Sequence, residues 1–265
     1  MDHLNIQNDD INYLIQAVDQ ASTVILNWYG DDSSGQIKSK SDHFPLTAAD
    51  LASNDILLRA LSSRWPNVPI LSEESQNIFA DDESPMHYWA VDPLDGTKEF
   101  IKKNNEFTVN VALISHGQPV LGVVAAPALD MLFVGVVGDG VRKRFKGKWE
   151  SLPFRSELFN HRNYHQHIKV AGSRSHPSPA LIDWLNLFQS HEFIEMGSSL
   201  KFCLVAEGKV NCYPRLGPTC LWDVAAGEAI LNAVGGCVLS WHNHNQPGIN
   251  YIYPRHVLND YFLAI

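Results

Sequence analysis

Residues 89–97, with the sequence WAVDPLDGT, decide the fold and the chemistry of this chain. An apolar strand stops in this stretch at an Asp-Pro pair, and the chain then turns through a glycine. Pro93 disfavours helical backbone at Asp92, so a tight turn can bring the carboxylates of Asp92 and Asp95 and the carbonyl of Leu94 toward one point. Oxygen ligands of this kind suit Mg²⁺. The stretch therefore predicts a divalent-cation site where a sheet strand ends.

Two other stretches place acidic residues beside apolar elements. Glu73 and Glu74 follow the apolar run 68–71, and Asp223 begins a helix rich in alanine. Each has a simpler explanation, because Asp223 can cap its helix and the glutamates can lie in a solvated loop. Taken together, these carboxylates would repel one another unless a divalent cation neutralised them, since no comparable basic cluster accompanies them. We therefore expect Asp223 and one of the two glutamates to join the metal site.

The residues after the acidic turn predict an anion site. The run 96–100, with the sequence GTKEF, is typical of a helix start with free backbone N–H groups, which favour a phosphate oxygen. Thr97 has no adjacent histidine to make it a nucleophile, so we expect it to orient a water with the help of Asp50. On composition alone, N-capping is an equally good role for Thr97, and Asp50 can simply complete a capping box with Thr47.

Composition limits the classes of partner. The 265 residues are 45% hydrophobic and 18% charged, which is enough apolar material for one large core or two joined ones. The net charge of −9 repels nucleic acid and anionic lipid, so a phosphorylated substrate must meet local positive charge, most simply from a metal ion. The four cysteines lack metal-finger spacing and indicate reduced thiols. No run approaches the roughly 20 apolar residues of a membrane span. We expect a cytoplasmic monomer, at most weakly peripheral on the cytoplasmic face of the inner membrane.

Hydrophobic periodicity divides the chain into two parts. Apolar spacing predicts helices over 9–28 and 47–65, the second ending before Pro66. Five short β-rich runs joined by turn-rich connectors then predict an antiparallel sheet, at 68–71, 88–91, 107–114, 120–126 and 131–137. Further on, strands alternate with helices, the strands at 168–171, 193–196, 210–213, 237–241 and 250–253 and the helices at 181–188, 200–207 and 222–234. We place a boundary in the polar stretch 152–167. It separates an α+β subdomain, 1–160, with most metal ligands from an α/β subdomain, 161–265, and the two share one cleft.

Three motifs, in their order and spacing, resemble the inositol monophosphatase superfamily: Ser72-Glu73-Glu74-Ser75, Asp92-Pro93-Leu94-Asp95-Gly96-Thr97 and Trp222-Asp223-Val224-Ala225-Ala226-Gly227. Within it, the runs 92–107, 197–208 and 213–215 resemble the CysQ branch, the 3'(2'),5'-bisphosphate nucleotidases. The resemblance implies a mixed α/β fold, a layered αβαβα sandwich of the sugar phosphatase type. It also implies Mg²⁺-dependent hydrolysis of adenosine 3',5'-bisphosphate to AMP and phosphate in support of sulfur assimilation, and inhibition by Li⁺.

The resemblance also implies roles for individual residues. Two or three Mg²⁺ ions would be held by four carboxylates and one carbonyl, those of Glu73, Asp92, Leu94, Asp95 and Asp223. Thr97 and Asp50, together with Glu73, would activate a water for in-line attack without a phosphoenzyme, while Glu74 would lie behind the ligands. The substrate would contact Gly96, Thr97, Ser173, His176, Gly197, Lys201 and Asp223.

Two parts of this assignment can be weighed from the residues themselves. Lys201 can supply a point charge for a phosphate, and the turn 197–199 allows close backbone approach. The sequence alone nevertheless favours an ordinary exposed helix lysine at 201. The segment 42–46, with the sequence DHFPL, replaces the small polar residues that usually precede the Thr-Ala-Ala-Asp motif, so the loop before Asp50 can differ in position.

Other functions would use the same carboxylates. An inositol monophosphatase or fructose-1,6-bisphosphatase would share the metal site but not the nucleotide-binding wall. An aspartyl-phosphate phosphatase also carries Asp-Gly-Thr, but its two acidic residues lie two apart, whereas Asp92 and Asp95 are three apart with Pro93 between them. A non-catalytic divalent-ion-binding protein would need no Thr97 to position a water.

Overall fold

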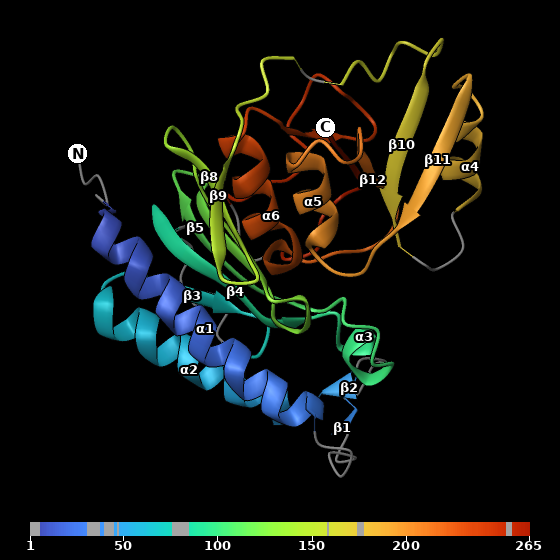
Figure 1. The fold of residues 1–265 in the computed structure, drawn as a ribbon. Helices are drawn as coiled ribbons and strands as arrows, with labels where there is room; N and C mark the ends of the chain where they lie inside the picture. The colour runs from blue at the N-terminus through green and yellow to red at the C-terminus, as the bar shows by residue number, and fades with distance from the viewer. Residues whose placement is uncertain are drawn as a thin grey trace.

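The chain folds into stacked layers of helices and sheets. The computed structural model describes residues 6–30, 38–39, 45–46, 48–75, 85–157, 159–173, 178–252 and 256–265. Helices α1 (Asn8–Gly30) and α2 (Ala48–Arg64) cover one face of a large sheet, and α5 (Leu200–Ala206) and α6 (Leu221–Ala233) cover the other (Figure 1). Beyond these lie β10 (His167–Gly172), β11 (Ser190–Glu195) and α4 (Pro179–Leu185). The predicted αβαβα layering is confirmed.

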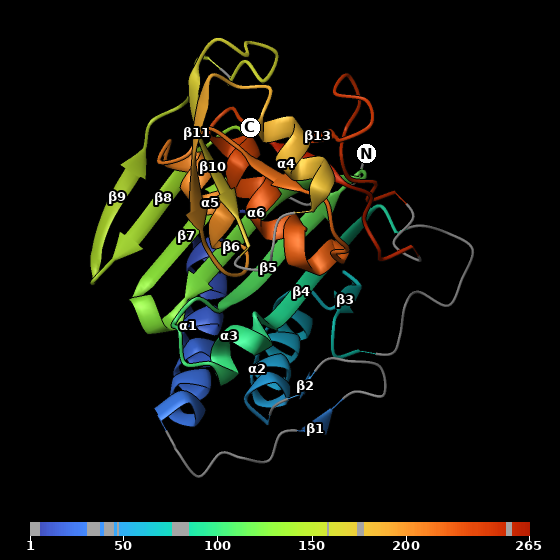
Figure 2. The same ribbon diagram turned by 90° about the vertical axis from the view of Figure 1, so that its right-hand side faces the viewer.

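The large sheet has seven strands in sequence order, seen side by side in Figure 2. Strands β3 and β4 pair in parallel and every later pair is antiparallel, in the order β3 (Ile70–Ser72), β4 (His87–Asp95), β5 (Thr108–Ser115), β6 (Gln118–Ala126), β7 (Met131–Val136), β8 (Gly140–Phe145) and β9 (Lys148–Leu152). The five predicted strands are present, but the prediction of antiparallel pairing is wrong for the first two, which pair in parallel. The hairpin β8–β9 was missed because five of the eight residues in 142–149 are basic, which hides the alternation of a strand.

Two glycines let α6 lie directly on this sheet. A Cβ atom at Gly122 in β6 would lie 2.3 Å from the carbonyl oxygen of Ala226, and one at Gly135 in β7 would lie 2.8 Å from the Cα of Ile230. Any larger side chain would push the helix away. The buried core beneath α5 and α6 draws on segments far apart in the sequence, from Leu71 in β3 to Phe262 near the C-terminus. The close contact fixes the position of the first turn of α6, which carries Asp223.

A smaller sheet completes the outer layer. Its strands β12 (Tyr213–Arg215), β14 (Phe262–Ala264) and β13 (Val238–Ser240) pair antiparallel in that order, and a bridge between Val170 and Cys212 joins it to the parallel pair β10–β11. The predicted strand at 250–253 is wrong for residues 250–252, and Tyr253 lies outside the described residues. The third strand of this sheet is instead β14, which was missed because its three residues are too few to show the alternation of a strand. The strand predicted at 210–213 begins only at its last residue.

The remaining short elements are β1 (Lys38–Ser39), which pairs with β2 (Pro45–Leu46), helix α3 (Thr97–Ile101) and a 3₁₀ turn at Pro127–Leu129. The four cysteines are free thiols, and those at 203 and 212 are buried. None of the helices in the described part of the chain has the length and apolar character needed to cross a bilayer.

Candidate functional site

Three carboxylates from separate elements converge at one end of the large sheet. Glu73 follows β3, Asp92 lies in β4, and Asp223 lies in the first turn of α6. One oxygen of each carboxylate lies within 4.8 Å of the others. The backbone N–H of Glu73 donates to the carbonyl of Val91 at 3.1 Å, which holds Glu73 beside the strand that carries Asp92. The parallel pairing of β3 and β4 thus brings together two of the predicted ligands.

The electrostatics of this cluster favour binding of a cation. Burial raises the pKa of Asp92 well above its usual range, and the charges of Glu73, Asp95, Asp223 and Asp50 raise it further. Burial and the neighbouring Asp95 also raise the pKa of Asp223. Like charges held together in a water-poor site need a counter-ion. An all-oxygen, acidic donor set fits a hard divalent cation such as Mg²⁺.

The backbone around Asp92 differs from the expected turn. Strand β4 continues through Pro93 to Asp95, so the prediction that it stops at Asp92 is wrong. Asp92 pairs with Asn110 and Asp95 with Thr108, so three steps along β4 face two along β5, which is a bulge. The carboxylate of Asp92 accepts a hydrogen bond from the N–H of Leu94 at 3.1 Å. A bulge in β4 therefore occupies the place where the sequence analysis expected a tight turn between Asp92 and Asp95.

Asp95 occupies a different environment from the other three acids. It lies outside the group that converges within 4.8 Å, although its charge acts on both Asp92 and Asp223. Its Oδ2 accepts hydrogen bonds from the backbone N–H of Ser199 at 2.8 Å and from Asn110 Nδ2 at 3.4 Å. Sequence reasoning missed both of these partners. A polar Asn110 in the middle of the apolar strand 107–114 was the available signal.

Asp223 caps its helix and also lies in the carboxylate cluster. Its Oδ2 accepts the backbone N–H of Cys220 at 2.7 Å, which caps the start of α6. The same side chain belongs to the carboxylate cluster. The capping bond fixes the orientation of the carboxylate, so the simple explanation and the functional one are compatible.

Thr97 and Asp50 approach the cluster from two further helices. The N-cap of α3 is Gly96, with φ of 89° and no side-chain capping bond, so N-capping by Thr97 is wrong. The Thr97 hydroxyl instead donates to the carbonyl of Leu94 at 3.4 Å. Asp50 is buried in the first turn of α2, where Ser53 ties the helix to the carbonyl of Pro93 at 2.8 Å. The capping-box partner proposed for Asp50, Thr47, lies outside the described residues, as do residues 42–44.

Lys201 is a buried cation. It is 5% exposed, so the interpretation of an ordinary surface lysine is wrong. Its ammonium group donates to the carbonyl of Ser198 at 2.5 Å and lies 5.2 Å from the ring centre of Tyr213. Burial lowers its pKa to about 8, and the nearby positive charge of Arg215 acts in the same direction. Arg215 was seen in the sequence only as part of a motif, so this pair of close cations was not predicted.

The glycine of the 197–199 turn is required for a reason different from the expected one. A Cβ at Gly197 would lie 2.6 Å from the carbonyl oxygen of Glu106, and the Gly197 N–H donates to the carboxylate of Glu106 at 2.8 Å. The backbone at Gly197 therefore packs closely against Glu106, whereas the sequence analysis expected it to approach a ligand. Ser173 directly follows β10. The carbonyl of its neighbour Gly172 accepts a hydrogen bond from the N–H of Met196 at 2.9 Å. His176 falls outside the described residues.

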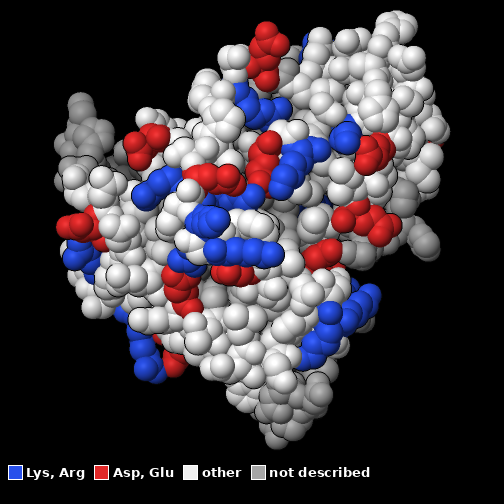
Figure 3. Space-filling model, viewed as in Figure 1, with Lys and Arg blue, Asp and Glu red and all other residues white. Residues whose placement is uncertain are grey.

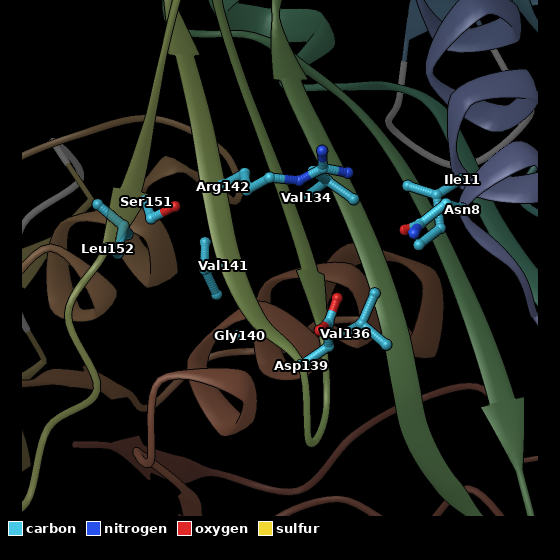
Figure 4. A pocket seen from close by; sticks show the side chains of 10 residues that line it. All are labelled: Asn8, Ile11, Val134, Val136, Asp139, Gly140, Val141, Arg142, Ser151 and Leu152. Carbon is cyan, nitrogen blue, oxygen red and sulfur yellow. The ribbon is translucent and has the colours of Figure 1, made fainter.

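Two pockets lie apart from these residues. One, of about 270 Å³, lies between the start of α1 and strands β7–β9 and is lined in part by Asn8, Asp139 and Arg142 (Figure 4). A second, of about 590 Å³, is lined by the 246–252 loop and its neighbours. Neither is lined by any predicted site residue. The converging carboxylates, and not cavity size, therefore identify the candidate site.

Comparison with known proteins agrees with this geometry. The model of the inositol monophosphatase family matches residues 7–263. The 3'(2'),5'-bisphosphate nucleotidase CysQ of Escherichia coli (strain K12) is 40% identical over 237 residues, covering 87% of this chain and 90% of the relative. The CysQ of Buchnera aphidicola is 39% identical over 93% of this chain and 89% of the relative. The crystal structure of CysQ from Bacteroides thetaiotaomicron superposes with a TM-score of 0.83 at 34% identity, covering 99% and 98% of the two chains.

Proposed function

This chain belongs to the inositol monophosphatase family, and from that premise we propose that it is a Mg²⁺-dependent 3'(2'),5'-bisphosphate nucleotidase. It would hydrolyse adenosine 3',5'-bisphosphate, a by-product of sulfate activation and sulfonate transfer, to AMP and phosphate. The convergence of Glu73, Asp92 and Asp223 carries the proposal, because it supplies a cation site for a phosphoryl group. The named relatives support phosphatase activity and favour the nucleotide over inositol phosphates or fructose 1,6-bisphosphate.

The metal ligands are proposed from the donor set. The carboxylates of Glu73, Asp92 and Asp223 would hold the cation, and the Leu94 carbonyl and Asp95 would complete two or three sites. Bound Mg²⁺ supplies Lewis-acid polarisation of the phosphoryl group and a lowered pKa for a coordinated water. The number of acids supports more than one ion, since more carboxylates surround Asp92 than one octahedral Mg²⁺ normally takes from a protein.

Three residues would act on the attacking water and the transferred phosphoryl group. The Thr97 hydroxyl would orient the water in line with the scissile bond, and the Asp50 and Glu73 carboxylates would accept its proton or hold its orientation. The backbone at Gly96 and Thr97 would contact the phosphoryl oxygens. Direct attack by water leaves no phosphorylated side chain. The placement of Ser53 against Pro93 supports this arrangement, because it anchors α2 and Asp50 beside the metal-binding strand.

The cation pair Lys201–Arg215 supports a substrate with a second phosphate. Burial lowers the pKa of Lys201 and the charge of Arg215 lowers it further, and an anion beside the two cations would stabilise the charged lysine. Lys201 is also within electrostatic range of Asp95, so the pair lies near the carboxylate cluster. We assign the second phosphate of the nucleotide to this pair, with Ser173, His176 and Gly197 along the same wall and Asp223 between the wall and the metal site. The cleft would then lie between parts 1–160 and 161–265.

We also propose that the enzyme acts as a cytoplasmic monomer. In Figure 3, Lys and Arg side chains alternate with Asp and Glu on the visible face, which does not form a field of one sign. Any weak association with the cytoplasmic face of the inner membrane would use the exposed cations of the β8–β9 hairpin, Arg142, Lys146 and Lys148. Vesicle flotation at low and physiological salt tests this localisation separately from the activity.

Phosphate release from a small substrate panel tests the proposed activity. We expect rapid Mg²⁺-dependent release from adenosine 3',5'-bisphosphate, slow release from inositol 1-phosphate and fructose 1,6-bisphosphate, loss of activity with EDTA and inhibition by Li⁺. Release confined to inositol 1-phosphate or the sugar would contradict the nucleotide assignment but keep the metal site. Trapping of a phosphoaspartate would contradict direct attack by water, and metal binding without turnover of any substrate would contradict the enzyme.

A further inference from the structure

Ser199 lies between two of the acidic residues of the candidate site, Asp95 and Asp223. It is the N-cap residue of α5 and is 2% exposed. Its backbone N–H donates to Asp95 Oδ2 at 2.8 Å, and its Oγ lies 2.7 Å from the backbone carbonyl oxygen of Asp223. Asp95 ends β4 and Asp223 begins α6, so one buried side chain contacts both the acidic end of the sheet and the acidic start of the helix.

The donors and acceptors around Ser199 form a directed chain. Thr108 Oγ1 donates to Asn110 Oδ1 at 3.0 Å, which orients the amide of Asn110. The amide nitrogen can only donate, and it lies 2.9 Å from Ser199 Oγ. Ser199 Oγ therefore accepts from Asn110 and directs its own hydrogen to the Asp223 carbonyl, the shorter of its two contacts. Both Thr108 and Asn110 are fully buried, so water does not compete for these bonds.

The same network fixes the carboxylate of Asp95. Among the described residues, the polar contacts of this side chain all reach Oδ2. The Ser199 N–H at 2.8 Å and Asn110 Nδ2 at 3.4 Å donate to it, while Ser199 Oγ at 3.2 Å and Thr108 Oγ1 at 3.4 Å lie beside it with their single hydrogens directed elsewhere. Donors gathered on one oxygen hold the plane of the carboxylate and leave Oδ1 for another ligand. Because Asp92 and Asp223 repel Asp95, a free Asp95 side chain would rotate away from them.

We propose that Ser199 and Asn110 are positioning residues for the divalent cation. They hold Asp95 against the repulsion of the other acids and tie it to the first turn of α6, so that the site is formed before the cation arrives. Residues that orient metal ligands commonly change metal affinity by about 10- to 100-fold when they are removed. The inference rests on the proposed metal site but not on the identity of the substrate.

Calorimetric titration of the metal-free full-length chain with Mg²⁺ tests this role without any substrate. We expect Ser199→Ala and Asn110→Ala each to weaken Mg²⁺ binding by about tenfold. The double variant should lose little more than the worse single variant, because both residues belong to one network. Ser22→Ala is the matched control, since Ser22 is a buried serine in α1 whose hydroxyl has no hydrogen-bond partner among the residues that the structure describes. It should bind Mg²⁺ like the parent.

Activity measured over a range of Mg²⁺ concentrations separates positioning from a folding defect. High Mg²⁺ should restore kcat of Ser199→Ala and leave KM for the nucleotide unchanged, whereas a misfolded fraction would not be recovered. If Ser199→Ala fails to fold by circular dichroism, the Asn110→Ala titration decides. Mg²⁺ affinity within twofold of the parent for the folded variants would overturn the proposal. If the variants bind Mg²⁺ more weakly but the parent protein does not hydrolyse the nucleotide, this inference stands and the proposed function is wrong.

Discussion

Two groups of buried charges in this molecule differ in how their charges are balanced. Lys143 in β8 lies 2.5 Å from Glu207 at the C-cap of α5, and their side chains are 7% and 8% exposed. Lys209 and Glu150 flank the pair, so positive and negative groups are equal in number. Around Asp92, the four charges that act most strongly on its carboxyl group are all negative.

The difference separates a structural ion pair from a ligand site. A buried pair is complete within the chain, and its desolvation cost is offset by its own Coulombic attraction. A buried group of like charges is incomplete, and folding becomes more favourable when a cation binds it. Charge balance therefore distinguishes the two groups more clearly than burial does, since the central residues of both, Lys143 and Asp92, are buried.

The largest expected effect comes from neutralising the acidic cluster. Asp92→Asn should lower kcat by about 1000-fold or more, because the site loses several kcal/mol of cation-derived stabilisation of the transition state. The same change should raise the melting temperature of the metal-free protein, since it relieves the repulsion that raises the pKa of Asp92. Melting curves with and without Mg²⁺ check this: Mg²⁺ should stabilise the parent and leave the variant unchanged. A variant that is less stable than the parent without metal would break the comparison.

Breaking the Lys143–Glu207 ion pair should lower the stability of the protein and leave its Mg²⁺ affinity unchanged. Glu207→Ala leaves Lys143 buried beside only the more distant Glu150, so the free energy of unfolding should fall by about 3 kcal/mol. Mg²⁺ affinity should not change, because the pair does not contact the acidic cluster. Urea unfolding together with Mg²⁺ titration measures both. Loss of Mg²⁺ binding without loss of stability would reverse the roles assigned to the two groups.

Glu228 gives a third case for the comparison, because it is a buried ionisable side chain outside both groups. Burial raises the pKa of Glu228 to about 7, and its partner is the Tyr251 hydroxyl at 2.7 Å. The folded state then keeps a proton that the unfolded state releases near pH 4.5, so the free energy of unfolding falls as pH rises from about 5 to 7.

Glu228→Gln cannot ionise and keeps a hydrogen-bonding group. Its unfolding free energy relative to the parent should therefore increase by about 2 kcal/mol between pH 5 and pH 8. Urea unfolding at both pH values measures the change, with Glu157→Gln as the exposed control that should show none. A difference that is constant with pH would mean that Glu228 is ionised throughout.

The smallest expected effect concerns the cation pair. Lys201→Met should raise KM for the nucleotide by about tenfold, the cost of one charged hydrogen bond, with little change in Mg²⁺ affinity. Because the pKa of Lys201 is about 8, KM of the parent should rise above that pH as the ammonium group loses its proton. KM of the variant should show no such rise. Lys209→Met is the exposed control, and a parent KM that is flat to pH 9 would contradict the assignment.

The sequence was sufficient for the parts of the site that depend on element ends. Apolar runs that end in acids, together with an acidic helix start, predicted that Asp92 and one of Glu73 and Glu74 would meet Asp223, and the family resemblance selected Glu73. The bulge between Asp92 and Asp95 was not predictable, since it depends on the register with β5. Lys201 was misjudged because its burial depends on α5 lying beneath β12, a contact between distant segments.

The central claim is that Glu73, Asp92 and Asp223 form a site for a divalent cation. A crystal of the parent protein soaked in Mn²⁺ and measured at the manganese absorption edge tests it directly, since Mn²⁺ takes the same oxygen ligands as Mg²⁺. The account predicts an anomalous peak bounded by these three carboxylates. A map with full-occupancy manganese elsewhere and none between them would contradict it.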